Sequence, residues 1–287
     1  YCDDRAKERR RERIADAPFS GIHFLDSGNY HYLSLLWLEK LTEPFSLVLV
    51  DHHPDKLRPA FGDITSCGGW VREALLTHLC LERVYVAGVE PELLEQEGIL
   101  TGVTVSGEKA DFPVERVHVG LSGLWERGGS GEEHRRPVYL SIDKDALRRQ
   151  DARCDWDQGE MSMEELFGLL DQIAGHCRIL GADVCGENPD DESGEDAEVN
   201  NRTNRRLAEK LGITPPSVTT ALRKLEAKGL IGKEGDPADQ RIQRIHLTEA
   251  GKEMLGELRR IVGEMENVIF RGISQEEKLL LRRLLLD

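Results

Sequence analysis

The sequence has few of the features that mark secreted or membrane proteins. No apolar run approaches the roughly 20 residues needed to span a bilayer. The N-terminal stretch YCDDRAKERRRER lacks the apolar core of a signal peptide. The six cysteines are scattered and form no Cys-x-x-Cys pair, which argues against a disulfide framework and against a zinc clip. We therefore expect a cytoplasmic protein with reduced thiols and no membrane partner.

Length and composition fit a folded protein with more than one domain. The chain has 287 residues, of which 39% are hydrophobic and 32% charged, and at about 150 residues per domain this length predicts about two domains. The net charge of −15 is uneven, because residues 201–287 hold 17 Lys and Arg against 13 Asp and Glu. The acidic first part disfavours a nucleic-acid surface there, whereas the mildly basic second part permits one.

The change in charge falls in an acidic stretch that contains Gly, Ser and Pro, NPDDESGEDAEVN. Such a composition is typical of a linker or a solvated loop. We predict a first domain over residues 1–195, a linker over 196–203 and a second domain over 204–287.

Short apolar runs and amphipathic segments alternate in the first region. The apolar runs are Gly21–Leu25, Leu47–Val50, Val84–Val89, Val114–Val119, Val138–Ile142 and Ile179–Val184. Stretches with helical periodicity lie between several of them, at His31–Lys40, Val71–Cys80 and Met163–Ile173. This alternation predicts an α/β fold with a parallel sheet and flanking helices. In such sheets the chemistry lies at the carboxyl ends of the strands.

Carboxylates and imidazoles follow two of these apolar runs. Asp51, His53 and Asp55 come after the second run, and Asp143 and Asp145 after the fifth. Alternation along an extended chain places each set on one side. A carboxylate-rich set with imidazoles suits Mn²⁺ or a similar divalent ion, although a single Asp-x-Asp at a strand end is more often a turn or a helix cap.

The same residues resemble motifs of the arginase/ureohydrolase superfamily over about residues 20 to 190. LVLVDHHPD resembles its Asp-x-His-x-Asp motif, YLSIDKDAL its Ser-x-Asp-x-Asp motif, and SGNYH a segment that ends in a ligating histidine. The resemblance implies two Mn²⁺ ions per chain, one held by His31 and Asp55 and the other by His53 and Asp145. Asp51 and Asp143 would bridge them.

The resemblance also implies hydrolysis of a C–N bond in a guanidino or related amine compound, with Asp55 orienting the nucleophile and receiving its proton. Among the departures from the family pattern, two concern predicted catalytic positions. Cys67 stands where the family has a proton-shuttling histidine, and it is either a substitute for that histidine or a buried thiol. Glu187, in DVCGENP, is one position later than the family's guanidinium-binding glutamate, and it either reaches the substrate or is structural.

The second region has the pattern of a helix-turn-helix. NRRLAEKLGI predicts a short helix, and Thr214 caps a second helix over about Pro215–Lys228. The second helix would present hydroxyl and basic side chains suited to a major groove. These are Ser217, Thr219, Thr220, Arg223 and Lys224. A β-hairpin is predicted after it from Leu230-Ile231, the turn GKEGDPADQR and the run Ile242–Leu247.

This region, about Asn204 to Asp287, resembles the MarR-type winged helix through KLEAKGLI, DPADQR and HLTEAGKEML. The resemblance implies binding to double-stranded DNA, with Arg241 at the wing tip in a minor groove and Asp239 bracing it. The segments Thr248–Phe270 and Ser274–Leu286 could form a dimer, so we expect a homo-oligomer. The alternative is a packing appendage without DNA binding.

Three functions therefore stay open on the sequence alone. The first is a manganese-dependent hydrolase with a DNA-binding tail, and the second is a transcription regulator whose arginase-like part senses a metal or an amine ligand. In the third, two unrelated genes or reading frames have been joined and neither half works as it does in its family.

Overall fold

The computed structural model describes residues 1–59, 64–125, 135–191, 193–211, 225–235, 243–257 and 260. The chain divides into two compact units, Tyr1–Thr214 and Pro215–Asp287. Each unit is described by itself below.

The first unit is built on one parallel sheet of six strands. The strands are β1 (Ile22–Phe24), β2 (Phe45–Val50), β3 (Leu81–Ala87), β4 (Val117–Val119), β5 (Arg136–Asp143) and β6 (Cys177–Cys185). Their order in the sheet is β1-β6-β5-β2-β3-β4, and every neighbouring pair is parallel. Each of the six predicted apolar runs overlaps one of these strands, so the predicted fold class is confirmed.

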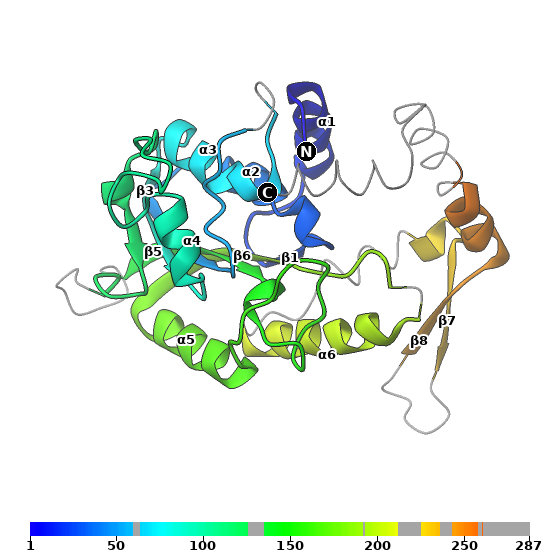
Figure 1. The fold of residues 1–287 in the computed structure, drawn as a ribbon. Helices are drawn as coiled ribbons and strands as arrows, with labels where there is room; N and C mark the ends of the chain where they lie inside the picture. The colour runs from blue at the N-terminus through cyan, green and yellow to red at the C-terminus, as the bar shows by residue number, and fades with distance from the viewer. Residues whose placement is uncertain are drawn as a thin grey trace. The chain divides into compact units, whose positions relative to one another are not determined.

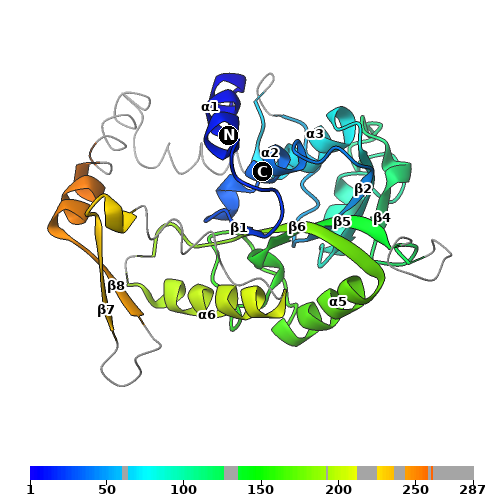
Figure 2. The same cartoon turned by 180° about the vertical axis from the view of Figure 1, so that it is seen from behind.

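Helices cover both faces of this sheet, as Figures 1 and 2 show. Along β2, Leu47 and Leu49 pack into one apolar cluster, and Val48 and Val50 into a second on the opposite face. The first cluster holds side chains of α2 (Leu33–Leu38), α3 (Trp70–Thr77) and α4 (Pro91–Gln96), and α1 (Asp4–Ile14) packs against it. The second cluster holds side chains of α5 (Met163–His176) and α6 (Glu195–Lys210). The alternating side chains of an extended strand thus produce a core on each face.

Three strands end side by side at one edge of the sheet. The register pairs Val50 with Ile142 and Asp143 with Cys185, so β2, β5 and β6 reach the edge at nearly the same level. Short 3₁₀ helices lie at this edge, at Gly28–Tyr30, Cys67–Gly69 and Lys144–Ala146. The polar residues that follow the strands are brought together here.

The structure corrects the predicted linker over residues 196–203. These residues belong to helix α6, which packs on the first unit: the amide nitrogen of Asn200 donates to the Arg153 carbonyl at 2.7 Å, and its amide oxygen accepts from the Arg153 N–H at 3.0 Å. Asn200, Thr203 and Leu207 are all buried. Their spacing of three and four residues places them on one helical face. The polar composition indicated a linker because that buried face is itself largely polar.

The described part of the second unit contains an antiparallel hairpin. Strands β7 (Ile231–Gly235) and β8 (Gln243–Leu247) pair from Ile231 with Leu247 to Gly235 with Gln243. The predicted hairpin is therefore confirmed. Residues 249–257 are helical, at the start of the predicted segment Thr248–Phe270. The segment Ser274–Leu286 lies outside the described residues.

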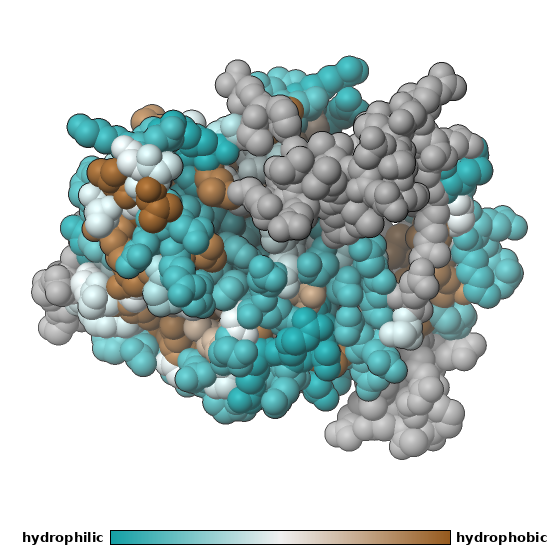
Figure 3. All heavy atoms as spheres, in the orientation of Figure 1, coloured by the Kyte–Doolittle hydropathy of each residue, from teal (hydrophilic) through white to brown (hydrophobic). Residues whose placement is uncertain are grey.

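The face of the molecule shown in Figure 3 is mainly hydrophilic, with apolar side chains gathered on the side where α3 and α4 lie in Figure 1. Large apolar residues exposed in that part of the chain include Leu76, Leu79, Leu100 and Val105. None of the helices within the described ranges combines the length and hydropathy that crossing a membrane requires.

Candidate metal centre

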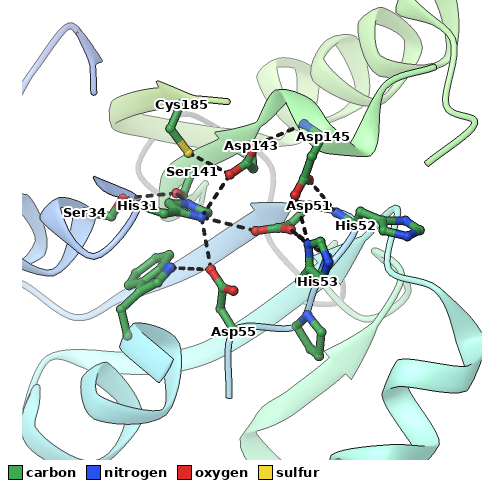
Figure 4. Close-up of polar contacts among 12 residues, drawn as sticks. His31, Ser34, Asp51, His52, His53, Asp55, Ser141, Asp143, Asp145 and Cys185 are labelled. Carbon is green, nitrogen blue, oxygen red and sulfur yellow. Dashed lines mark hydrogen bonds and ion pairs between the residues drawn. The ribbon is translucent and has the colours of Figure 1, made fainter. Parts of the chain in front are cut away.

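Six predicted ligand residues meet at the edge where β2 and β5 end (Figure 4). Asp51, His53 and Asp55 follow β2, while Asp143 ends β5 and Asp145 lies in the next turn. His31 caps the 3₁₀ helix at Gly28–Tyr30. Two strand ends and one upstream histidine thus lie in a single cluster.

Backbone amides hold one oxygen of three of the aspartates. The His53 N–H donates to Asp51 Oδ1 at 2.6 Å, the Asp145 N–H to Asp143 Oδ1 at 3.0 Å, and the His52 N–H to Asp145 Oδ1 at 3.0 Å. The other oxygen of each aspartate faces a histidine of the cluster at 2.9 to 3.5 Å. The local turns at the strand ends therefore aim these carboxylates.

The cluster has two halves that share Asp51. Around His31, the Nδ1 atom lies 3.2 Å from Asp51 Oδ2, 3.0 Å from Asp55 Oδ2 and 3.5 Å from Asp143 Oδ2. Around His53, the Nδ1 atom lies 2.9 Å from Asp145 Oδ2 and 3.7 Å from Asp51 Oδ1. We call these the His31 half, which contains His31, Asp55, Asp143 and Cys185, and the His53 half, which contains His53 and Asp145.

A relay behind His31 fixes its orientation. His31 Nε2 lies 2.8 Å from Ser141 Oγ, and that hydroxyl donates to Asp183 Oδ1 at 2.7 Å. With Nε2 directed at the serine, Nδ1 faces the carboxylates, and it would offer its lone pair to an ion bound between them. Metal-ligating histidines are commonly held in this way.

Asp55 is held by a tryptophan and by an uncommon backbone conformation. Its φ is +52°, in the left-handed region that residues other than glycine seldom adopt. The Trp70 indole N–H donates to Asp55 Oδ2 at 2.6 Å, and Trp70 is fully buried at the start of α3. The backbone of Asp55 is tied to the same helix, because its carbonyl accepts from the Val71 N–H at 3.1 Å. These contacts point the carboxylate at His31.

Burial and mutual charge shift the pKa values of the cluster: burial alone would raise the pKa of Asp51, but hydrogen bonds from His31 and His53 outweigh it and lower that pKa. Burial and then the charge of Asp51 raise the pKa of Asp55 to about 6. Burial and the neighbouring Asp143 raise the pKa of Asp145 well above its ordinary value. Burial disfavours the charged form of His53, but hydrogen bonds to Asp145 and Asp51 and the charges of these carboxylates outweigh burial and raise the pKa of His53 to about 12. The cluster thus favours added positive charge, which a divalent cation would supply.

The donor set fits divalent cations. Two groups of three donors, His31 with Asp51 and Asp55, and Asp51 with His53 and Asp145, each keep their ligand atoms within 4.8 Å of one another. Carboxylate and imidazole donors suit ions such as Mn²⁺. Asp51 belongs to both groups, as expected for a bridging ligand. Asp143, the other predicted bridge, is instead grouped with His31 and Cys185.

The two other predicted catalytic residues lie close to the cluster but are engaged differently. Cys67 is half-buried, and burial, followed by the charge of Asp55, raises the pKa of its thiol to about 11, so it stays protonated near neutral pH. Glu187 accepts from the buried Lys144 ammonium and from the Asn204 side chain at 2.8 Å. Its carboxylate therefore joins the 3₁₀ helix Lys144–Ala146, which follows β5, to α6.

Sequence reasoning missed Cys185 and Trp70. Cys185 is buried, and its Sγ lies 3.0 Å from Asp143 Oδ2. Its place at the end of a predicted strand could have identified it, because every other strand-end ligand was found in that way. No pattern in the sequence marks Trp70. Ser141 belongs to the Ser-x-Asp-x-Asp motif, but its contact with His31 was not predicted.

The predicted DNA-contacting residues lie outside the described residues. They are Ser217, Thr219, Thr220, Arg223, Lys224, Asp239 and Arg241. Their roles stay predictions.

A protein-family model matches a segment that begins in α6 and extends into the C-terminal region. Residues 198–243 match the family model described as MarR family. The match begins inside α6, so this helix belongs to the first unit by its packing and to the MarR match by its sequence.

Individual proteins match the two regions separately. An uncharacterized protein of Thermotoga maritima is 36% identical over 168 residues, which are 58% of this chain and 58% of that protein. The chain therefore spans less than two thirds of that relative's length. A solved structure of proclavaminate amidino hydrolase from Streptomyces clavuligerus is similar at 20% identity and a TM-score of 0.48, over 74% of this chain and 69% of that one.

The MepR–DNA complex of S. aureus is similar at 34% identity and a TM-score of 0.23, over 28% of this chain and 59% of that one. The family model over residues 198–243 thus names the same MarR family that the motifs of the C-terminal region resemble.

Proposed function

We propose that the first unit is a binuclear metal-dependent hydrolase that cleaves a C–N bond of a guanidino or related amine compound, with Mn²⁺ as its cofactor. The observation that carries this proposal is the pair of donor groups joined through Asp51. His31, Asp55 and Asp143 would hold one ion, His53 and Asp145 the other, and Asp51 both. Such a pair supplies a water that ionises near neutral pH and a positive charge that stabilises the transition state.

The residues around the ions have separate tasks in this proposal. Asp55 orients the attacking water and accepts its proton, while the Trp70 indole holds the carboxylate oxygen in place. The substrate enters beside the His53 half, since the His53 side chain is 25% exposed and that of His31 only 2%. Trp156 lies edge-on to His53, with ring centroids 5.8 Å apart, and offers an aromatic surface to a cationic substrate. The acidic charge of residues 1–200 also attracts such a substrate.

The direct test is turnover by the full chain loaded with Mn²⁺. A panel of guanidino compounds is assayed for release of urea and of the matching amine. We expect turnover of at least one compound, and a loss of about 10²-fold or more in Asp55→Asn, which is the typical contribution of a positioned acid or base. Asp16→Asn, an exposed aspartate of the same unit, is the control. Two bound ions without any turnover would contradict the hydrolase and favour a sensor.

The MarR match favours a second function, binding to double-stranded DNA by the C-terminal region. The predicted recognition residues and the hairpin that leads to Arg241 support this proposal. In the regulator alternative, the first unit senses a metal or an amine. Helix α6 offers a route for such sensing, because Asn200 binds Arg153 in the segment that follows Asp145, while the MarR match starts at residue 198.

DNA binding is tested with the full chain and a labelled duplex at low salt, with and without Mn²⁺. Wild type should bind, and Arg241→Ala should weaken binding. Arg178→Ala, which removes an exposed arginine paired with Glu43 in the first unit, should not. A different affinity with and without the metal would measure a coupling free energy between the two regions. Equal DNA binding by wild type and Arg241→Ala would contradict a role of Arg241 in DNA binding.

A further inference from the structure

We propose that Cys185 is a ligand of the metal centre and that it makes the His31 half select a thiophilic ion, such as Co²⁺, Zn²⁺ or Fe²⁺, while the His53 half keeps Mn²⁺. This inference rests on the proposed binuclear centre. It adds a sulfur ligand and a difference in metal preference between the two halves.

The sheet itself places the thiol in the cluster. Cys185 is the last residue of β6 and pairs in register with Asp143, the last residue of β5. Its Sγ lies 3.0 Å from Asp143 Oδ2. The sulfur, that oxygen and a ring nitrogen of His31 form a third group whose ligand atoms all lie within 4.8 Å of one another (Figure 4). The thiol is therefore one member of a three-donor group.

The residue after Cys185 shows how closely β6 approaches this centre. Gly186 has a φ of +93°, and a Cβ there would lie 2.5 Å from Asp143 Oδ1 and 2.8 Å from the Lys144 nitrogen. Only glycine fits this backbone position, because any side chain would collide with the ligand itself. The turn thus keeps the end of β6, and the Cys185 sulfur with it, against Asp143.

The chemistry of the two halves predicts different ions. Sulfur is a soft donor, and sites that combine Cys with His and carboxylate favour Zn²⁺, Co²⁺ or Fe²⁺ over Mn²⁺. The group around His53 contains only imidazole nitrogen and carboxylate oxygen, which suits Mn²⁺. The thiol proton leaves to the buffer as the sulfur binds the ion.

The experiment uses the full chain, stripped of metal and titrated with Co²⁺. A thiolate ligand gives an intense near-ultraviolet charge-transfer band that imidazole and carboxylate ligands do not give. We expect this band in wild type and its loss in Cys185→Ser. The matched control is Cys154→Ser, another buried cysteine whose thiol donates to the Gly186 carbonyl at 3.0 Å and which belongs to none of the three donor groups. This variant should keep the band.

Metal competition gives a second measurement. The preference of the His31 half for Co²⁺ over Mn²⁺ should fall by about 10-fold to 100-fold in Cys185→Ser, a range typical of changes around a metal site. The preference should stay unchanged in Cys154→Ser. X-ray absorption of the Co²⁺-loaded wild type should detect a sulfur neighbour, and this readout does not depend on a variant that folds. Two bound Co²⁺ ions with neither band nor sulfur neighbour would overturn the role of Cys185 and leave the binuclear centre standing. Failure to bind Co²⁺, Zn²⁺ or Mn²⁺ at all would overturn both.

Discussion

The two halves of the metal centre differ in what surrounds them. His31 is enclosed, with Ser141 and Asp183 behind one ring nitrogen and three carboxylates in front of the other. His53 has a partly exposed side chain and packs edge-on against Trp156. The fold therefore fixes the His31 half through buried contacts, while the His53 half is partly open to solvent. Asp51 faces both histidines, so it lies between the enclosed environment of His31 and the partly exposed environment of His53.

The largest expected effect comes from the residue that the halves share. Asp51→Ala should reduce metal binding from about two ions per chain to nearly none, because each ion loses a ligand and the bridge between them disappears. Isothermal titration with Mn²⁺ measures the stoichiometry, and Asp16→Ala is the control. If one ion still bound tightly, the two halves would be independent sites.

The next effect is on the free energy of unfolding, and it should differ between the two halves because they are buried to different degrees. In the metal-free chain, His31→Ala should cost about 3–5 kcal/mol, since it removes the positively charged partner of three buried carboxylates. His53→Ala should cost less, about 1.5–3 kcal/mol, the range for a hydrogen bond to a charged group. All four tryptophans lie in the first unit, so their fluorescence during urea unfolding reports on this unit alone. Equal losses would contradict the difference in environment.

A smaller effect should follow from the relay behind His31. Ser141→Ala removes the group that accepts from His31 Nε2, and the ion in the His31 half should bind about 10-fold to 100-fold more weakly. The His53 half should keep its affinity. Ser46→Ala is a matched control, because Ser46 is buried on the adjacent strand and its hydroxyl has no hydrogen-bond partner among the residues that the structure describes. A loss of the same size in both halves would mean that the relay acts on the whole fold.

The smallest effect is a pH-dependent change in the free energy of unfolding, at an ion pair that lies outside both halves. Arg72, in the helix that carries Trp70, donates to Asp111 at 2.8 Å, and this contact lowers the pKa of Asp111. A lowered pKa in the folded state stabilises the protein above the unfolded pKa, and this contribution is lost as the pH falls through the folded value. Asp111→Asn should therefore cost below about 1 kcal/mol at pH 7, and the difference should vanish in strong acid.

Urea unfolding at several pH values checks this, with Glu115→Gln, another exposed acid, as the control. A change in metal affinity on Asp111→Asn would show that the halves respond to surface charge, against the account.

Much of the first unit could be predicted because its signals are local. Each of the six strands is a short apolar run, and the ligands follow strands that end at one edge. The contribution of Trp70 could not be predicted in the same way, because it depends on a contact with Asp55 that only the packing of α3 creates. Cys185 does follow a predicted strand, but its pairing with Asp143 depends on the strand register, which the sequence does not specify.

Helix α6 and helix α1 show the limits of composition. The segment after Asn188 is acidic and polar, yet Asn200 and Thr203 are buried through hydrogen bonds to backbone carbonyls of Arg153 and Asp151. A polar residue that bonds backbone in this way leaves no apolar signal. Helix α1 is mainly charged and was not predicted, although Ala6 and Ile14 pack against the core. The roles predicted for the MarR-like residues stay predictions.

The most direct test of the account is the position of metal ions in crystals of the full chain grown with Mn²⁺. Anomalous scattering locates the ions without reference to any assumed ligand. The account predicts two peaks on either side of Asp51, one beside His31 Nδ1 and one beside His53 Nδ1. No peak at this edge of the sheet, with Mn²⁺ in excess, would contradict it.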